Sequence, residues 1–343
     1  MMKKRISVLL SCICILGTAC GVAEAAEGTD IQLDGTYVVH YRDQHDQNPG
    51  DRTRTGYKET LTLNATIPVQ EKLSLYARFT YQTLQNNYGI FSADYVNSKK
   101  QNNAALDAMG ITYKNAAYSY KLGLQALTFG GGAIYDNTYI GHHSLPYAVK
   151  ISGKVGRVES TFIGAKTNYQ TGIENDTFYV LQGSYAIDKK TSVGAMLANV
   201  SYGKDTASRY FLPNRNVCYL SLYGSKNLTD KISLSTEIVR SNSSENNTAI
   251  QATIKKKLDA KNTISAGYYR IENDAVVVDY NAAEMSTYPN SNAQGYTVAW
   301  THTFNQNISM KIGEYSYKKI NAASSSGAAT DRSRFTATVT AKF

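Results

Sequence analysis

The chain has 343 residues, a formal net charge of +9 and 27 tyrosines against one tryptophan. Beyond residue 25 no apolar run is long enough to cross a membrane as a helix, which excludes a helical membrane protein. No linker, charge block or low-complexity break divides the chain into two domains, and nothing in it indicates a nucleic-acid partner.

The first 25 residues are typical of a secretory signal peptide. A basic stretch at residues 3–5 precedes an apolar run at residues 6–16, which is too short to span a membrane as a helix. The Ala-Glu-Ala sequence that ends at Ala25 predicts cleavage after this residue. The mature chain, residues 26–343, would keep a formal net charge of +7, because three cations and one carboxylate leave with the signal.

Three of the four cysteines lie in the signal peptide, so Cys218 would be the single thiol of the mature chain. One thiol cannot form an intrachain disulfide, and we interpret Cys218 as a small apolar strand residue. A lipoprotein, with a lipid on Cys20, is an open alternative. It has the weaker motif, because the position three residues before Cys20 is Gly17, where a large aliphatic residue is usual.

The mature chain consists of segments in which apolar and polar residues alternate, as they do in strands with two unlike faces. In the last segment Phe335, Val339 and Phe343 share the apolar face, and the chain ends on this aromatic residue. The segments predict about sixteen strands, over residues 31–42, 57–67, 72–84, 106–114, 118–128, 147–155, 157–166, 177–187, 191–202, 217–226, 231–241, 248–258, 263–271, 293–304, 308–318 and 333–343.

The connections between these strands alternate between short and long. The first short connection is a predicted tight turn over residues 68–71, and it lies between longer connections at 43–56 and 85–105. Many tyrosines fall near strand ends, where a membrane interface would suit their apolar ring and polar hydroxyl. The sequence therefore predicts an all-β fold, a transmembrane antiparallel β-barrel with short periplasmic turns and longer outer loops.

On these features the chain resembles the sixteen-stranded general porins of Gram-negative outer membranes. The resemblance rests on the alternating strands, the terminal Phe343 and the long third outer loop that begins at Phe129. It implies a homotrimer, a third loop over residues 129–146 folded into the pore, and recognition of Phe343 as an assembly signal by the barrel-insertion machinery. The acidic cluster common on this loop in the family is reduced here to Asp136.

Two other motifs have simpler explanations than ligand binding. Gly130 to Gly132 lack the Lys-Ser/Thr of a phosphate loop, so we interpret them as the flexible start of the third loop. His142 and His143 could bind a metal, but adjacent histidines point apart in an extended chain and have no Cys or carboxylate cluster nearby. We therefore predict no cofactor, no metal site and no catalytic residues.

The alternation also predicts which charges face the interior of the barrel, because the apolar residues of each strand fix its lipid side. A charged side chain turned to lipid would cost about 2 to 4 kcal/mol near the membrane midplane. The predicted pore-lining cations are Arg42, Lys58, Arg78, Lys121, Lys150, Lys154, Arg157, Lys255, Lys257, Lys311 and Arg334, and the inward carboxylates are Asp34, Glu159 and Glu237, with Asp136 on the third loop.

A basic lumen favours anions over cations. The sequence thus predicts a channel in the outer membrane for passive diffusion of small hydrophilic solutes and ions, with weak anion selectivity. A substrate-specific channel for sugars or anions, and less readily a structural barrel or adhesin, are alternatives. An outer-membrane enzyme would need a cluster of Ser, His and an acid, and no spacing around His40 or His302 singles out such a set.

Overall fold

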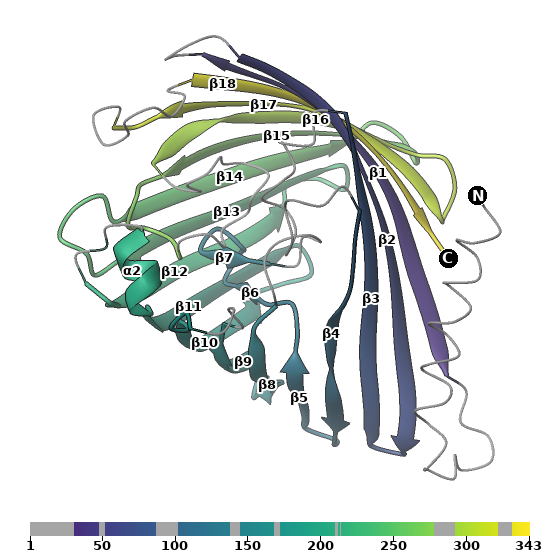
Figure 1. Ribbon diagram of the computed structural model, residues 1–343, viewed down its shortest axis with the longest axis vertical. Coiled ribbons are helices and arrows are strands. Elements are labelled where there is room, and N and C mark those ends of the chain that lie inside the picture. Colours follow the sequence, from purple (N-terminus) through teal and green to yellow (C-terminus); the bar gives the residue numbers. More distant parts are fainter. Residues whose placement is uncertain are drawn as a thin grey trace.

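The computed structural model describes residues 31–47, 52–86, 102–137, 145–167, 172–209, 212, 214–277, 292–321 and 331–343. Within these ranges sixteen antiparallel strands form one closed barrel, which confirms the predicted all-β fold (Figure 1). A separate two-stranded sheet, β6 and β7, lies inside it. Among the described residues, no helix is long and apolar enough to cross a membrane. The predicted signal peptide lies outside the described residues.

The barrel strands follow one another around the wall in chain order. They are β1 (Gln32–Gln47), β2 (Arg52–Gln70), β3 (Leu73–Asn86), β4 (Asn102–Lys114), β5 (Tyr118–Leu124), β8 (Tyr147–Val155), β9 (Val158–Lys166), β10 (Thr177–Ala186), β11 (Thr191–Ser201), β12 (Asn216–Asn227), β13 (Ile232–Ser241), β14 (Thr248–Lys257), β15 (Asn262–Ile271), β16 (Ala293–Thr303), β17 (Ile308–Lys319) and β18 (Asp331–Lys342). The inner strands are β6 (Thr128–Phe129) and β7 (Tyr135–Asp136), and α2 (Lys204–Arg209) is a short helix.

Several predicted boundaries differ from the structure by three or more residues, and β2 and β4 begin five and four residues earlier than predicted, at Arg52 and Asn102. β1 continues to Gln47, well beyond residue 42, and β5 ends at Leu124, where the chain turns into the barrel. The predicted turn over residues 68–71 is wrong, because β2 continues to Gln70 and Pro68 pairs with Ser74. A register shift between Pro68 and Gln70 marks the strand end, where a proline is tolerated because its missing amide proton loses no regular ladder bond.

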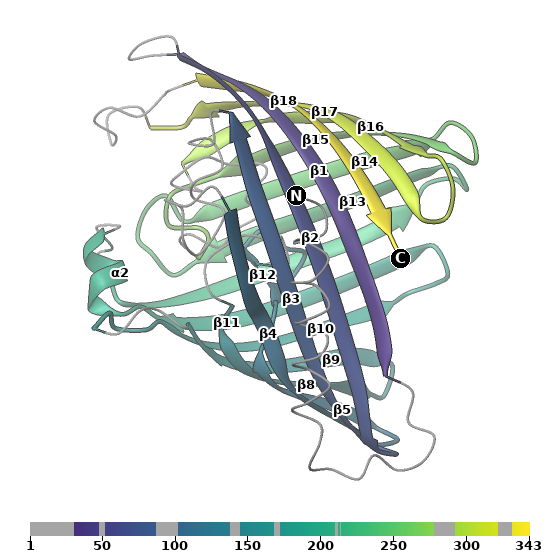
Figure 2. The same cartoon turned by 45° about the vertical axis from the view of Figure 1, so that its right-hand side comes forward.

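The first and last strands close the barrel, and they lie side by side in Figure 2. At the end of β18, the amide of Gly35 donates to the carbonyl of Phe343 at 2.8 Å, and the amide of Phe343 donates back at 3.1 Å. The Phe343 ring covers Gly35 so closely that a Cβ on Gly35 would lie 2.6 Å from it. The closure therefore depends on both residues of this pair.

The two faces of the wall differ as the alternation predicts. Large apolar side chains such as Leu181 and Leu222, each 59% exposed, cover the outer face. The opposite face is polar on β1 to β3, where His40, Thr60 and Thr80 are buried. On β10 to β15 the inner face is apolar in part, and Phe178, Met196, Tyr219 and Tyr269 of this face belong to a buried hydrophobic cluster.

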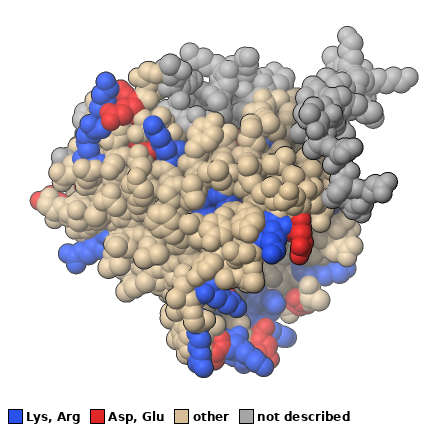
Figure 3. Space-filling model, turned by 90° about the horizontal axis from the view of Figure 1, so that it is seen from below, with Lys and Arg blue, Asp and Glu red and all other residues tan. Residues whose placement is uncertain are grey.

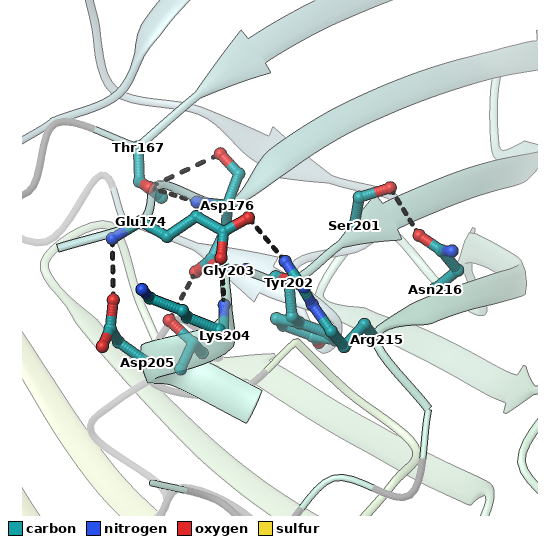
Figure 4. A network of polar contacts seen from close by, with 11 residues as sticks. Thr167, Glu174, Asp176, Ser201, Tyr202, Gly203, Lys204, Asp205, Arg215 and Asn216 are labelled. Carbon is teal, nitrogen blue, oxygen red and sulfur yellow. Dashed lines mark hydrogen bonds and ion pairs between the residues drawn. The ribbon is translucent and has the colours of Figure 1, made fainter. Parts of the chain in front are cut away.

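Beyond one end of the barrel, two connections are joined by a network of polar contacts (Figure 4). The carboxylate of Glu174 accepts hydrogen bonds from the Lys204 amide at 2.7 Å and from Arg215 at 2.6 Å. Buried Asp176 accepts from the Gly203 amide at 2.8 Å. Glu174, Lys204 and Arg215 are thus fixed to one another ahead of β10 and β12.

This network gives a prediction for acid sensitivity. The hydrogen bonds from Lys204 and then Arg215 hold the pKa of Glu174 below its ordinary value of 4.5. A lowered carboxylate pKa stabilises the folded loops above the ordinary value, and this stabilisation is lost as the pH falls from about 4.5 through the folded pKa. We expect proteolysis of these loops to accelerate below pH 4.5 in the native protein. In a Glu174→Gln variant proteolysis should already be fast at neutral pH; equal cleavage rates in both proteins at neutral pH would contradict this role.

Candidate functional site

The strand registers show which charged residues share one face of the wall. Lys58 lies opposite His40, Arg78 opposite Asn64, and Lys121 opposite Lys150. Residues directly opposite each other on paired strands point to the same side of a sheet. When this rule is applied from strand to strand around the barrel, the buried polar residues of β1 to β3 lie on the same face as Glu237 of β13. Glu237 contacts the loop inside the barrel. This shared face is the inner one.

The predicted pore-lining residues lie as follows. The strand residues on the inner face are Arg42, Lys58, Arg78, Lys121, Lys150, Lys154, Lys255, Lys257, Lys311 and Arg334, together with the carboxylates Asp34, Glu159 and Glu237. Arg157 lies in the turn between β8 and β9 and not on a strand, because Gly156 takes a positive φ of 62° there. Asp136 is on β7, paired with Thr128.

Carboxylates that the sequence did not assign to the interior neutralise part of this charge. Arg78 donates to both oxygens of Asp107, at 2.7 and 2.8 Å. A register shift after Arg78 makes Asp107 the extra residue of β4, so that it can reach the inner face. Arg332 and Asp46 form a second, largely buried ion pair near the end of β1. Glu159, which the sequence did assign to the interior, forms a third and exposed ion pair with Lys154 at 3.0 Å.

Lys121 and Lys150 are two cations of this set that no carboxylate compensates in the described part of the chain. They lie directly opposite each other on β5 and β8, an arrangement of like charges that disfavours the pairing of the strands. The Lys121 Nζ lies 4.0 Å from the centre of the Tyr76 ring, a favourable cation–π contact. In the described part of the chain neither lysine forms an ion pair with a carboxylate. The two ammonium groups therefore remain available to attract anions.

After β5 the chain enters the barrel as the inner loop, residues 125–137 (Figures 1 and 2). Its centre is held by Glu237 of β13, which is 1% exposed. The amides of Gly131 and Ala133 donate to the two carboxylate oxygens of Glu237, both at 2.9 Å. Ser221 and Gln251 donate to the same carboxylate at 2.6 and 2.9 Å. Glu237 is therefore a fixed anchor for the loop and not a free lumen charge.

The glycines of this loop have a structural reason that the sequence interpretation missed. Gly130 and Gly132 have positive φ angles of 58° and 97°. A Cβ on Gly130 or Gly131 would lie 2.6 or 2.7 Å from the carboxylate of Glu237. The three glycines let the amides of Gly131 and Ala133 converge on one anion, an arrangement similar to a backbone nest. They are thus required for close approach to the wall.

Apolar packing completes the attachment of the inner loop. The rings of Phe129 and Tyr135 stack with their centroids 4.3 Å apart, and both contact Phe178 of β10. A second segment, residues 275–277, also belongs to this cluster. The Val277 amide donates to the carbonyl of Ile134 at 3.1 Å. These apolar contacts occupy part of the interior beside β10 to β15. The polar interior lies along β1 to β5 and β18, beside the basic wall formed by Arg42, Lys58, Arg78, Lys121, Lys150 and Arg334.

Figure 3 shows the molecule of Figure 1 from below. Lys and Arg side chains lie at the edge and also in the middle of this face. Within the described residues no three His, Cys, Asp or Glu side chains are grouped closely enough to hold a metal ion. His142 and His143 lie outside the described residues. Cys218 is a free, exposed cysteine on the outer face of β12.

Comparison with solved structures shows the same kind of barrel. A quintuple mutant of Rh. blastica porin covers 92% of this chain and is itself covered completely, with a TM-score of 0.56 and 9% identity. A triple mutant of Rhodopseudomonas blastica porin matches over the same share of both chains, with a TM-score of 0.56 and 8% identity. No protein-family model and no curated protein sequence matches the chain. The fold is thus that of a sixteen-stranded porin barrel.

Proposed function

We propose that the protein is an outer-membrane porin, a water-filled channel for passive diffusion of small hydrophilic solutes and ions. The observation that carries this proposal is a closed porin-like barrel whose interior is divided between an anchored apolar loop and a basic polar wall. A sixteen-stranded barrel is too wide for its own side chains to fill. The exposed apolar outer face suits lipid contact, and the resemblance to porins supports a homotrimer inserted by the barrel-assembly machinery.

Diffusion without a dedicated binding site predicts a simple dependence on solute size. In liposomes that contain the purified protein, we expect uncharged sugars to enter at rates that fall smoothly as their size increases. One sugar that enters far faster than a smaller one would favour the alternative of a substrate-specific channel. The described inner face offers no continuous aromatic ladder for such a sugar, since Tyr76 and Tyr223 lie on separate parts of the wall.

The charge of the wall leads us to propose a weak anion selectivity. On the inner face of the described strands, Lys and Arg outnumber Asp and Glu even when the ion pairs of Arg78 and Arg332 are taken into account. A unit charge acts over a Debye length of about 8 Å at physiological ionic strength and about 30 Å at 0.01 M. The preference should therefore be strongest in dilute salt.

Replacing Lys121 and Lys150 together by glutamine should weaken this selectivity. A unit charge at 4 Å contributes about 1 kcal/mol in water, so we expect the anion preference in dilute salt to fall about twofold to fivefold. The measurement is the reversal potential in a salt gradient. Lys226→Gln with Lys256→Gln removes the same charge from the outer face and is the matched control. An equal shift in both double variants would contradict the assignment of the pore.

A further inference from the structure

The segment that follows β15, residues 272–277, enters the barrel although it belongs to a connection between strands. Ala275, Val276 and Val277 are each at most 1% exposed, and they pack in the same hydrophobic cluster as Tyr219 of the inner face. Connections normally run over the surface of a protein, where such side chains would remain exposed. Nothing in passive diffusion along the basic wall requires three consecutive buried residues at this position.

Backbone contacts trace the path of this segment across the neighbouring strand. The Glu272 amide donates to the carbonyl of Thr248, the first residue of β14, at 3.1 Å, and the Thr248 amide donates to the Glu272 carboxylate at 3.0 Å. The Asp274 amide donates to the carbonyl of Asn246 at 2.8 Å, just ahead of β14. The chain therefore turns from the end of β15 across the start of β14.

The segment ends in contact with both the wall and the inner loop. On β12, the Tyr219 hydroxyl donates to the carbonyl of Val276 at 3.3 Å, and it lies 2.7 Å from the Tyr202 hydroxyl. The Val277 amide then donates to the carbonyl of Ile134 at 3.1 Å. β15 and β12 are three strand spacings apart, about 14 Å, which six residues can bridge because an extended chain covers about 3.3 Å per residue. The segment therefore forms a bridge along the inner side of β14 to β12.

The inner loop is consequently attached at two neighbouring points by different partners. The amides of Gly131 and Ala133 donate to Glu237 of the wall, whereas the carbonyl of Ile134 accepts from the segment after β15. The Ile134 side chain has no exposed surface. Because the two attachments hold adjacent residues, each restricts the movement that loss of the other would allow.

We propose that residues 275–277 help to determine the size limit of the pore, as positioning residues that hold the inner loop in place. The segment and the loop together narrow the lumen on the side of β12 to β14 and leave the basic wall as the route for solutes. Val276 and Val277 act through the loop and do not touch the solute, since both are buried. The inference rests on the proposed channel function.

The test measures the entry of raffinose, a trisaccharide, relative to arabinose, a monosaccharide, into liposomes that contain the full-length mature protein. Val276→Asn with Val277→Asn places two amide side chains in an apolar site, where burial without hydrogen bonds is unfavourable. The segment should then leave this site for water, and the relative entry of raffinose should rise several-fold. Neither change adds a charge, so the charge of the basic wall is preserved.

Ile173→Asn is the matched control, because Ile173 is 36% exposed in the connection between β9 and β10 and does not belong to the cluster. It should leave the relative entry of raffinose unchanged. Heat-modifiable mobility shows whether each barrel is folded. Unchanged relative entry in the folded double variant, or an equal rise in Ile173→Asn, would overturn the proposal.

A disulfide between the segment and the loop tests the same attachment without adding polar groups to the cluster. Ile134→Cys with Val277→Cys, in a Cys218→Ser background, should form this disulfide, because a hydrogen bond between the two residues brings their Cα atoms close to the separation of bridged cysteines. When Glu237→Ala is added, the oxidised protein should keep the wild-type raffinose ratio, and reduction should raise it. Equal ratios before and after reduction would contradict the proposal.

The channel function and the size limit fail in different experiments. A wild type that admits neither sugar would contradict the proposed channel. Failure of the disulfide to form in a folded barrel would show that the segment does not hold the loop, whether or not the barrel conducts.

Discussion

Replacing Glu237 by alanine should release the inner loop from the wall and increase the single-channel conductance. The change leaves the buried amides of Gly131 and Ala133 without their acceptor. Each unsatisfied buried group costs about 1–3 kcal/mol, which favours a conformation in which the loop reaches water. Phe129 and Tyr135 would lose their fixed position with it, so we also expect larger current fluctuations.

Glu159→Ala is the matched control for this experiment. It removes the same charge from the inner face, but Glu159 pairs with the exposed Lys154 and does not contact the inner loop. The measurement is single-channel conductance in planar bilayers at high salt, where charge differences are screened. If the two variants conduct equally, Glu237 does not position the loop. The heat-modifiable mobility of each protein shows whether its barrel has formed.

Deletion of Phe343 is expected to reduce the yield of folded barrel strongly. The deletion removes two hydrogen bonds between Phe343 and Gly35, worth about 1–3 kcal/mol together. It also removes the ring that covers Gly35 at the seam between β1 and β18. The deletion also removes the aromatic residue that we propose, from the resemblance to porins, as the signal for the insertion machinery.

Two variants separate these contributions. Gly35→Val keeps Phe343 but forces its ring away, so it should lower the folded fraction through closure alone. Phe304→Ala removes an aromatic residue of comparable exposure from the turn after β16 and should have a small effect. The readout is the fraction of heat-modifiable barrel in isolated membranes. Comparable fractions in the wild type and the Phe343 deletion would show that the terminal residue is dispensable.

The strands could be predicted well because both faces of the wall are specified by residue type. β8 spans Tyr147–Val155 as the alternation predicts, and β9 to β18 differ from the predicted ranges by at most two residues at either end. The same alternation predicts the side to which Lys121 and Lys150 point, because a shift of one residue would turn charges toward lipid. The sequence analysis assigned no face to Glu314, and the structure places it on the outer face, opposite Phe335.

The remaining features depend on contacts between residues far apart in the sequence. The anchor joins Glu237 to Gly131, which is 106 residues away, and no local pattern marks it. Asp107 reaches the inner face through a register shift, which breaks the period of two on which the prediction relied. Asp46 lies within the connection predicted over residues 43–56, although β1 continues to Gln47. The residues beyond 42 are polar and show no alternation that would indicate a strand.

The reversal potential of the wild-type channel in a gradient of dilute potassium chloride tests the central claim most directly. The claim is that the cations of the basic wall determine the electric field in a water-filled pore. The charge of Glu237 is compensated by hydrogen bonds and that of Asp107 by its ion pair with Arg78. We predict a reversal potential whose sign shows that chloride passes more readily than potassium. Its magnitude should decline as the salt concentration is raised and the Debye length shortens from about 30 to about 8 Å. A channel that prefers potassium in dilute salt, or a folded barrel that passes no current, would contradict it.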